Sequence, residues 1–329
     1  MSPKFHLALV LTLMLTPAGL VHAQAALPAK VAAANPSPHE LLQNSKRIVF
    51  LGDSITAAGE YVADVDAWLL SQGLKTIPTV IDAGLASETV SGLSEDGHAG
   101  GAFPRPDLAE RLDRILAVTK PDLVVACYGM NCGIYLPFDA GRFEKYQQGI
   151  NSLKAAVEKT GAKFVVVTPP FYDDLRAPLP FSYNAVLDRY SEWLIEQRQA
   201  GWRVADLHGP MTKEVAKHRL TDPKFTFQPD GVHPNSAGHW FVAQQVIAWF
   251  GDESATAAAT PQDLLKAKQL PPEVLSLVQQ RVSILRDAYV GAAGHKRPGV
   301  GKGLPIPEAE QKAAELTAKI QKVVADGKK

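Results

Sequence analysis

The chain has little of several features that mark specialised proteins. It holds two cysteines among 329 residues, and its 34 basic side chains balance 34 acidic ones. So few cysteines exclude a small domain built on disulfides, and the lack of a basic excess argues against nucleic acid as the main partner. With 46% hydrophobic and 21% charged residues, the composition is that of a folded protein and excludes intrinsic disorder. The length predicts about two domains, or one large domain with an appendage.

Long apolar runs are also scarce, and the one that stands out lies at the start of the chain. Leu7–Leu15 follows Lys4 and is too short to span a bilayer comfortably. Val21–Ala23 then offers a small-residue cleavage site. We therefore expect residues 1–23 to be a signal peptide, with a membrane anchor as the alternative. The mature protein is then periplasmic or secreted, in an oxidising compartment and without a membrane anchor.

The two cysteines lie close together in the sequence. Cys127 and Cys132 are separated by four residues at a predicted strand end. A disulfide across so short a loop demands a particular geometry, and two buried thiols are the alternative. Without a second pair of ligands, this spacing is not that of a zinc site.

Short apolar runs alternate with segments of helical spacing along the middle of the chain. Five runs predict strands, at Arg47–Leu51, Val80–Asp82, Leu123–Tyr128, Lys163–Thr168 and Trp202–Asp206. Helices are predicted between and after them, at 61–72, 108–118, 143–159, 183–199 and 236–250. Strands without polar alternation, separated by helices, indicate a parallel sheet that is buried on both faces. The pattern predicts an α/β domain over residues 45–251, in which ligands bind at the carboxyl ends of the strands.

Two segments flank this predicted domain. Residues 24–44 begin with an Ala- and Pro-rich stretch and are interpreted as an N-terminal arm. The stretch 251–261, rich in Ala, Thr and Ser, is interpreted as a linker. Helical spacing over 273–289 and 307–325 then predicts a helical extension over residues 252–329.

A candidate nucleophile follows the first predicted strand. That strand runs into Gly52-Asp53-Ser54, which places Ser54 where ligands bind in this architecture. Capping the next helix is the alternative role for this serine. A serine hydroxyl is a weak nucleophile at neutral pH, so catalysis also needs a nearby base.

Such a base is present before the last helix of the predicted domain. Asp230 and His233 lie three residues apart in one loop. We expect His233 to take the proton from Ser54, while Asp230 orients the imidazole and stabilises its charged form. An isolated Asp-x-x-His is usually a capping pair, but its occurrence together with the serine motif favours catalysis.

A third element ends the third predicted strand. Gly129-Met130-Asn131 places an asparagine amide there, and such an amide can donate a hydrogen bond to a developing oxyanion. One donor of this kind is worth about 3 kcal/mol of the activation barrier. A turn formed by Gly-x-Asn is the alternative.

Together these motifs resemble the blocks of the GDSL, or SGNH, hydrolase family. The matching residues are Gly52, Asp53, Ser54 and Ile55, then Gly129, Met130 and Asn131, and finally Asp230 and His233. The resemblance implies a three-layer flavodoxin-like fold and ester hydrolysis without a metal or cofactor. It also implies a triad of Ser54, His233 and Asp230, and an oxyanion hole that includes Ser54 and Asn131.

Two positions depart from the family pattern. Between the serine block and the Gly-x-Asn block, the family usually has a further block with a glycine whose N–H completes the oxyanion hole. When Glu88 and Thr89 are aligned with that block, Ser87 stands at the position of the glycine. A serine N–H donates equally well where its dihedral angles are allowed. Ser87 is therefore the predicted third donor, with Gly84 as the alternative. The family's third block often continues with Asp, whereas this chain has Cys132.

The resemblance and the predicted export suggest a substrate class. Secreted proteins of this kind most often resemble carbohydrate esterases or small-acyl esterases, and no long apolar segment is available to cover a lipid chain. We expect hydrolysis of O-acyl esters, above all O-acetyl groups on carbohydrate. A lipase or lysophospholipase is the alternative. Asp53 and Arg105 are candidate substrate-binding residues, and for Arg105 a solvated loop charge is the alternative.

A glycan-binding protein is a hypothesis from a different class. Residues 252–329 carry 12 basic and 9 acidic side chains, a net charge of +3. Within them, the loop His295-Lys296-Arg297-Pro298 would suit an anionic glycan. The alternative is an appendage that packs on the catalytic domain.

Overall fold

A computed structural model describes Met1 and residues 36–327. Apart from Met1, the predicted signal peptide lies outside the described residues. The predicted arm lies outside them as far as residue 35.

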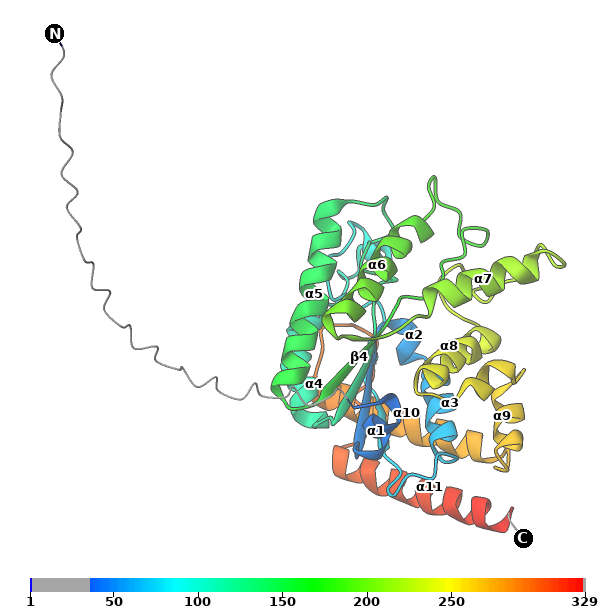
Figure 1. Cartoon of the computed structure of the whole chain (residues 1–329). Helices are drawn as coiled ribbons and strands as arrows, with labels where there is room; N and C mark the ends of the chain where they lie inside the picture. The colour runs from blue at the N-terminus through cyan, green and yellow to red at the C-terminus, as the bar shows by residue number, and fades with distance from the viewer. Residues whose placement is uncertain (2–35, 328–329) are drawn as a thin grey trace. The chain divides into compact units, whose positions relative to one another are not determined.

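The centre of the protein is a five-stranded sheet in the order β2-β1-β3-β4-β5 (Figure 1). Every pair of neighbouring strands is parallel. The bounds are β1 Arg47–Gly52, β2 Thr79–Asp82, β3 Leu123–Cys127, β4 Lys163–Val167 and β5 Arg203–Ala205. The predicted parallel α/β sheet is thus confirmed, and each strand lies within about a residue of its predicted bounds.

The helices alternate with the strands and continue beyond them. Their bounds are α1 Pro38–Gln43, α2 Ser54–Ala57, α3 Glu60–Leu69, α4 Leu112–Thr119, α5 Ala140–Lys159, α6 Asn184–Glu196, α7 His208–Arg219, α8 Ser236–Trp249, α9 Pro261–Ala267, α10 Val274–Ala293 and α11 Ile306–Asp326. The pattern did not predict α1, α2, α7 or α9. A capping box begins α1, because Ser37 and Glu40 each accept a hydrogen bond from the other's backbone N–H.

Helices cover both faces of the sheet (Figure 1), and each face has its own apolar core. On one face, Phe50 and Val125 pack in a core with α3 and α8. On the other face, Val49 and Val124 pack in a core with α4, α5 and α6. Successive residues of a strand point to opposite faces, so each strand supplies both cores, which explains its continuous apolar sequence.

Helix α10 joins the two cores at the β2 edge of the sheet. Val278 and Val282 belong to the core with α3 and α8, whereas Leu285 and Tyr289 belong to the core with α4 and α5. An uncovered edge strand presents unpaired backbone groups that invite pairing with another chain. The helical C-terminal region therefore protects the short edge strand β2, which α10 contacts directly.

Two arginines bind α10 to the helices that follow β1. Arg281 donates to both carboxylate oxygens of Asp66 on α3, at 2.9 and 2.8 Å, and both side chains are buried. Arg286 donates to the carbonyl of Ala57, the last residue of α2, at 2.8 Å. The C-terminal helices thus contact the short helix that begins at Ser54.

The connection between α8 and α9 is packed, although its composition was interpreted as that of a linker. Trp240 and Gln244 on α8 both donate side-chain hydrogen bonds to the carbonyl of Ala258. Residues from Pro36 onward form one compact unit. The division between a hydrolase domain at 45–251 and an extension at 252–329 stays a prediction.

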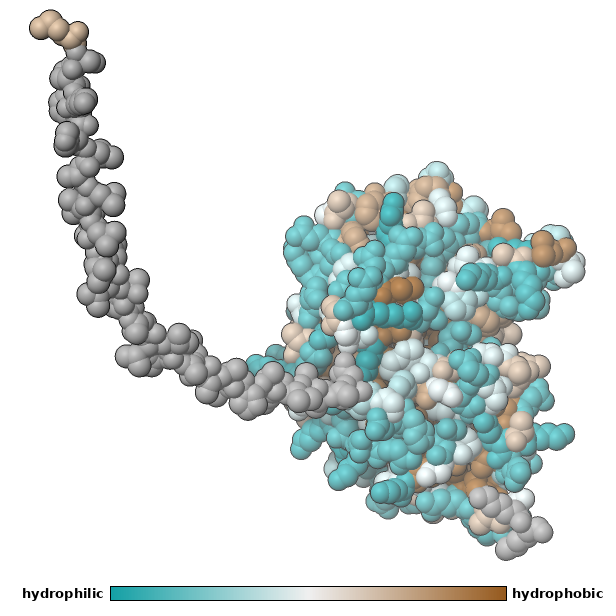
Figure 2. Space-filling view, in the orientation of Figure 1, coloured by the Kyte–Doolittle hydropathy of each residue, from teal (hydrophilic) through white to brown (hydrophobic). Residues whose placement is uncertain are grey.

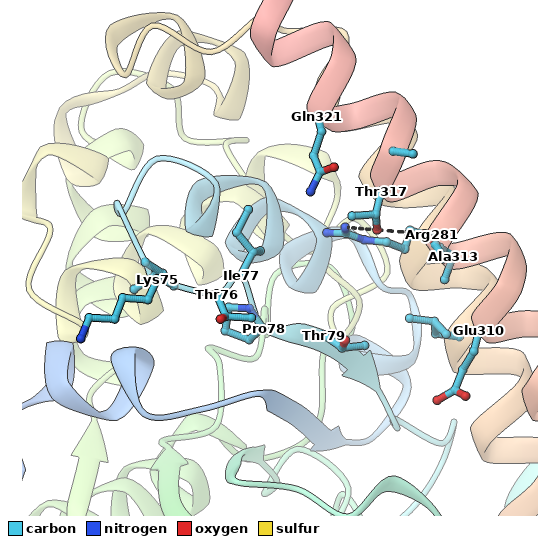
Figure 3. Close-up of a pocket in the computed structure, with 14 residues that line it drawn as sticks. Lys75, Thr76, Ile77, Pro78, Thr79, Arg281, Glu310, Ala313, Thr317 and Gln321 are labelled. Carbon is cyan, nitrogen blue, oxygen red and sulfur yellow. Dashed lines mark hydrogen bonds between the residues drawn. The ribbon is translucent and has the colours of Figure 1, made fainter.

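A groove of about 660 Å³ lies between the loop before β2 and helices α10 and α11 (Figure 3). Its walls include Ile77, Thr79, Ala313 and Thr317. Since Thr79 begins β2, this groove lies at the amino end of the strands, opposite the end that carries Ser54. It is therefore separate from the predicted catalytic residues.

We expect Arg281→Met to destabilise the fold, because it leaves the Asp66 carboxylate buried without its partner. Loss of one member of a buried pair costs about 3–5 kcal/mol of unfolding free energy. The double variant Asp66→Leu/Arg281→Met should regain most of that loss, as measured by urea denaturation. Arg189→Met, which removes an exposed ion pair with Glu192, is the control and should cost under about 1 kcal/mol. A double variant no more stable than Arg281→Met would contradict this account.

Asp252 should make stability depend on pH. Partial burial acts to raise its pKa, but hydrogen bonds from Lys268, Ser254 and Trp68 outweigh burial and lower the pKa from 3.8 to about 2. A carboxyl group whose pKa is lower in the folded state than in the unfolded state stabilises the fold at any pH above its unfolded-state pKa. This stabilisation disappears as the pH falls through the folded-state pKa. Asp252→Asn should therefore cost about 2 kcal/mol at pH 6 and progressively less from pH 4 to pH 2. Urea denaturation across this range measures the difference, and a difference independent of pH would refute it.

Candidate active site

Loops at the carboxyl end of the sheet bring the predicted catalytic residues together. Ser54 begins α2 directly after β1, and Asn131 follows β3 by four positions. His233 comes from the loop before α8. Asp53 caps α2, because its Oδ1 accepts a hydrogen bond from the N–H of Ile55 at 3.0 Å. This cap holds Ser54 at the first turn of the helix.

Ser54, His233 and Asp230 form a continuous chain of hydrogen bonds. Ser54 Oγ lies 2.8 Å from His233 Nε2, and His233 Nδ1 lies 2.7 Å from Asp230 Oδ2. The second oxygen of Asp230 accepts hydrogen bonds from the N–H groups of Val232 and His233, at 2.9 and 2.7 Å. The carboxylate thus orients both the backbone of its own loop and the imidazole ring.

The acid–base part of this chain is open to solvent. The side chains of His233 and Asp230 are 51% and 59% exposed. Partial burial acts to raise the pKa of Asp230, yet hydrogen bonds from His233 and Val232 lower it below its usual value. Asp230 is therefore ionised at neutral pH, which suits it to stabilise an imidazolium.

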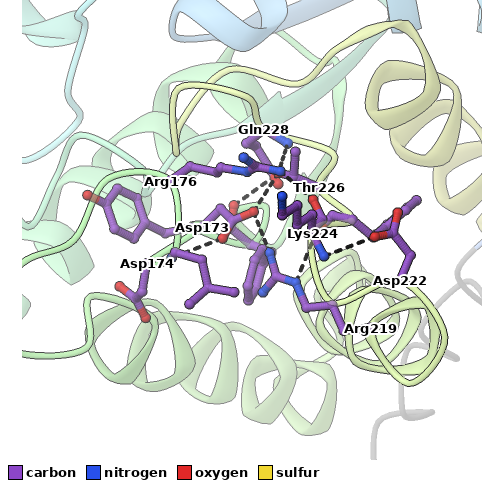
Figure 4. Close-up of polar contacts among 12 residues, drawn as sticks. Asp173, Asp174, Arg176, Arg219, Asp222, Lys224, Thr226 and Gln228 are labelled. Atoms are coloured by element: carbon purple, nitrogen blue, oxygen red, sulfur yellow. Dashed lines mark hydrogen bonds and ion pairs between the residues drawn. The ribbon is translucent and has the colours of Figure 1, made fainter.

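A polar network behind this loop fixes its position (Figure 4). Asp173 is fully buried, and its N–H donates to the carbonyl of Gly231 at 2.9 Å. Its carboxylate accepts hydrogen bonds from Arg219 and Thr226, and Arg219 also donates to the carbonyl of Phe225. The loop after β4 and the end of α7 thereby hold the segment that carries Asp230, at Gly231 and at the residues before Asp230.

Ser87 has the backbone conformation of a glycine. Its φ angle is +69°, in the left-handed region that non-glycine residues rarely occupy. Gly84, the alternative oxyanion donor, already donates its N–H to Asp82 Oδ1 at 2.8 Å. A Cβ at Gly84 would lie 2.4 Å from the backbone nitrogen of Ala57, so this glycine allows close packing against α2. Ser87 as the third oxyanion donor stays a prediction.

The amide of Asn131 is held at both of its polar atoms. Nδ2 donates to the carbonyl of Glu88 at 3.3 Å, and Oδ1 accepts from the hydroxyl of Tyr135 at 3.0 Å. An amide nitrogen carries two hydrogens, so one remains for another acceptor. The sequence motif identified the asparagine but gave no sign of Tyr135.

A buried ion pair lies beneath these residues. Glu88 has no exposed surface and accepts two hydrogen bonds from Arg111, at 2.6 and 2.7 Å. Tyr128 at the end of β3 donates a third, at 2.6 Å, and Arg111 also donates to the carbonyl of Ala83. The pair connects the loop after β2, the end of β3 and the start of α4. The amino-acid sequence gives no sign of this pair, because one Glu and one Arg 23 positions apart form no motif.

The two candidate substrate-binding residues are largely buried. Burial raises the pKa of Asp53 to about 6, although the hydrogen bond from Ile55 opposes it. The side chain of Arg105 is 7% exposed and donates two hydrogen bonds to Glu95, both at 2.6 Å. The alternative of a solvated loop charge for Arg105 is therefore wrong. Contact of Asp53 or Arg105 with substrate stays a prediction.

Both cysteines are free, buried thiols. Burial raises the pKa of Cys132 to about 12 and that of Cys127 further, so neither is a nucleophile at neutral pH. Over residues 36–327, no cluster of His, Cys, Asp and Glu side chains has the arrangement of a metal site. No helix in the same part of the chain is long and apolar enough to cross a membrane.

Structural comparison finds similar proteins at low sequence identity. One is a gut microbial diltiazem-metabolizing enzyme, 24% identical, with a TM-score of 0.48 over 63% of this chain and 47% of that one. This chain thus matches about half the length of that enzyme. Axe2, an acetylxylan esterase from Geobacillus stearothermophilus, is 22% identical, with a TM-score of 0.47 over 63% and 94% of the two chains. The acetyl xylan esterase AlAXEase is 20% identical, with a TM-score of 0.49 over 61% and 98%.

Comparison with protein families gives a direct assignment, whereas no curated protein matches the sequence. The family described as GDSL-like lipase/acylhydrolase matches residues 50–241. This range is more than half of the chain and contains Ser54, Ser87, Asn131, Asp230 and His233. The protein therefore belongs to the GDSL-like lipase/acylhydrolase family.

Proposed function

We propose that the protein is a serine esterase in which Ser54 is the nucleophile, His233 the general base and acid, and Asp230 the residue that orients His233. The observation that carries this proposal is the unbroken hydrogen-bond chain, with contacts of 2.8 and 2.7 Å between the three side chains. A serine becomes a useful nucleophile when such a base can take its proton.

In this mechanism His233 moves one proton in each half of the reaction. Ser54 Oγ attacks the ester carbonyl carbon while its proton passes to His233 Nε2. The bond to the alcohol oxygen then breaks, and that oxygen takes the proton from His233, which leaves an acyl ester on Ser54. Water next gives a proton to His233 and attacks this ester. Ser54 Oγ leaves with the proton, and the carboxylic acid is released.

Three donors would stabilise the negative oxygen that forms in each attack. They are the N–H groups of Ser54 and Ser87 and the free amide hydrogen of Asn131. Ser54 is the first residue of α2, so its N–H has no partner within the helix. The left-handed backbone at Ser87 supports its position as a substitute for glycine.

We further propose that the substrate is an O-acetylated carbohydrate and that the enzyme is exported to the periplasm or beyond the cell. The half-exposed His233 and Asp230 support a substrate whose bulk stays outside the protein while only a small acyl group reaches Ser54. The expected signal peptide supports export. The carbohydrate esterases among the similar structures are consistent with this choice but do not decide it.

A longer acyl chain is the second candidate, because apolar side chains lie on the loops at this end of the sheet. Leu136 and Phe138 follow β3, Leu175 follows β4, and all three are exposed. The face of the protein shown in Figure 2 is mostly hydrophilic, with small separate apolar areas. The glycan-binding loop has less support, because Arg297 packs over the ring of Phe103 at 4.9 Å.

Ser54→Ala should abolish ester hydrolysis, because it removes the attacking oxygen. Loss of a triad nucleophile lowers kcat by about 10⁶-fold. The assay compares p-nitrophenyl esters from acetyl to decanoyl with release of acetate from acetylated xylan. Ser276→Ala, at an exposed serine on α10, is the control and should retain full activity. Activity that survives Ser54→Ala would refute the mechanism, and highest kcat/KM on the decanoyl ester would favour the lipase-like alternative.

Asn131→Ala should lower kcat while KM changes little, because the amide stabilises charge that exists only in the transition state. Removal of one oxyanion donor costs about 10²- to 10³-fold in kcat. Asn151→Ala removes an exposed asparagine on α5 and should leave kcat unchanged. Steady-state kinetics on the acetyl ester measures both. A rise in KM at constant kcat for Asn131→Ala would place this amide in ground-state binding instead.

A further inference from the structure

We propose that Tyr135 is a positioning residue for the oxyanion hole: its hydroxyl fixes the Asn131 amide with one N–H directed at the reacting oxygen. The inference rests on the proposed serine esterase mechanism and extends it. Tyr135 lies four residues after Asn131 and contacts it through the 3.0 Å hydrogen bond to Oδ1.

The partners of the Asn131 amide define its orientation. The carbonyl of Glu88 can only accept a hydrogen bond, so the atom that faces it is the nitrogen, Nδ2. Oδ1 therefore faces Tyr135, whose hydroxyl donates the proton. The contact to Glu88 is long, at 3.3 Å, and the contact from Tyr135 is the shorter of the two. Without the hydroxyl, the amide would be held by its weaker bond alone and would rotate more freely.

The ring of Tyr135 is itself held firmly in place. Tyr183 stacks on it with ring centroids 4.9 Å apart, and the Arg105 guanidinium lies 5.2 Å from its centroid. Tyr183 in turn donates to the carbonyl of Met130 at 2.8 Å, next to Asn131 in sequence. Arg105 is held by its two hydrogen bonds to Glu95. These aromatic and cationic contacts restrict the orientation of the Tyr135 ring and therefore the direction of its hydroxyl.

The backbone around Tyr135 is strained. Ile134 and Tyr135 have φ angles of +48° and +53°, and such angles are unfavourable for residues with a bulky side chain. Two in succession reverse the chain direction after Asn131, where the N–H of Ile134 also donates to the carbonyl of Asn131 at 3.0 Å. This reversal brings the Tyr135 ring back against the amide. Strain of this kind persists only where surrounding contacts hold it.

The hydrogen bond also makes the amide a better donor. A proton donated to Oδ1 draws electron density toward the oxygen and polarises the N–H groups at Nδ2. The effect grows as negative charge develops on the substrate oxygen, so it acts on the transition state more than on bound substrate. Loss of the hydroxyl is therefore expected to change kcat and to leave KM largely unchanged.

The test is Tyr135→Phe, which keeps the ring and its stacking but removes the hydroxyl. We expect kcat on the acetyl ester to fall about tenfold, the scale of one hydrogen bond, with KM within about twofold of wild type. Tyr172→Phe is the matched control, because Tyr172 packs in the same aromatic group but donates to the carbonyl of Ala177. It should retain wild-type kcat. Thermal unfolding of each variant verifies that it is folded.

A double-mutant cycle separates positioning from a general structural effect. If Tyr135 acts through the amide, Tyr135→Phe should have no further effect on kcat in the Asn131→Ala background. A tenfold loss in both backgrounds, or wild-type kcat in the single variant, would overturn the positioning role while Ser54→Ala still tests the esterase mechanism. Wild-type kcat in Asn131→Ala would overturn the proposed oxyanion hole, and this inference with it.

Discussion

The buried Glu88–Arg111 ion pair is the interaction on which the proposed oxyanion hole depends. Glu88 follows Ser87 in sequence, and its carbonyl accepts the hydrogen bond from Asn131. Burial raises the pKa of the Glu88 carboxyl, although the charge and hydrogen bonds of Arg111 oppose this rise. An unpaired charge in this position would be very unfavourable, so the loop after β2 must keep Glu88 against Arg111. That requirement places the N–H of Ser87 and the acceptor for Asn131 together.

The two halves of the site are held by different means. The oxyanion side lies among buried charges and aromatic rings, where a low dielectric strengthens each hydrogen bond. The acid–base side is exposed, and its order comes from backbone hydrogen bonds to Asp230 and from the contacts of buried Asp173 behind the loop. In the proposed mechanism, a rigid oxyanion hole beside an accessible base suits a reaction in which charge develops at one fixed point while substrate and water exchange with solvent.

Much of the fold could be predicted, and so could the meeting of Ser54, His233 and Asp230 in one hydrogen-bond chain, because both depend on local sequence. Continuous apolar runs predict buried parallel strands, and Ser54, Asn131 and the Asp230–His233 pair follow from short motifs at strand ends. Tyr135, Asp173 and Glu88 could not be found in this way. Their roles depend on contacts between distant segments, or on a chain reversal at Ile134 for which no glycine gives a signal. Helices α1, α2, α7 and α9 are short or weakly amphipathic, so periodicity does not reveal them.

The C-terminal helices can influence Ser54, the proposed nucleophile, because α10 contacts the helix that begins with it. Arg286 donates to the last carbonyl of α2, whose other end begins with Ser54. A four-residue helix forms few internal hydrogen bonds and depends on partners at its ends, which Asp53 supplies at the start and Arg286 at the finish. Arg281 secures the same helix α10 to Asp66 in the core. Loosening α10 would therefore disturb the support of Ser54 as well as the cover of β2, so the C-terminal segment would affect the proposed catalysis through the position of α2.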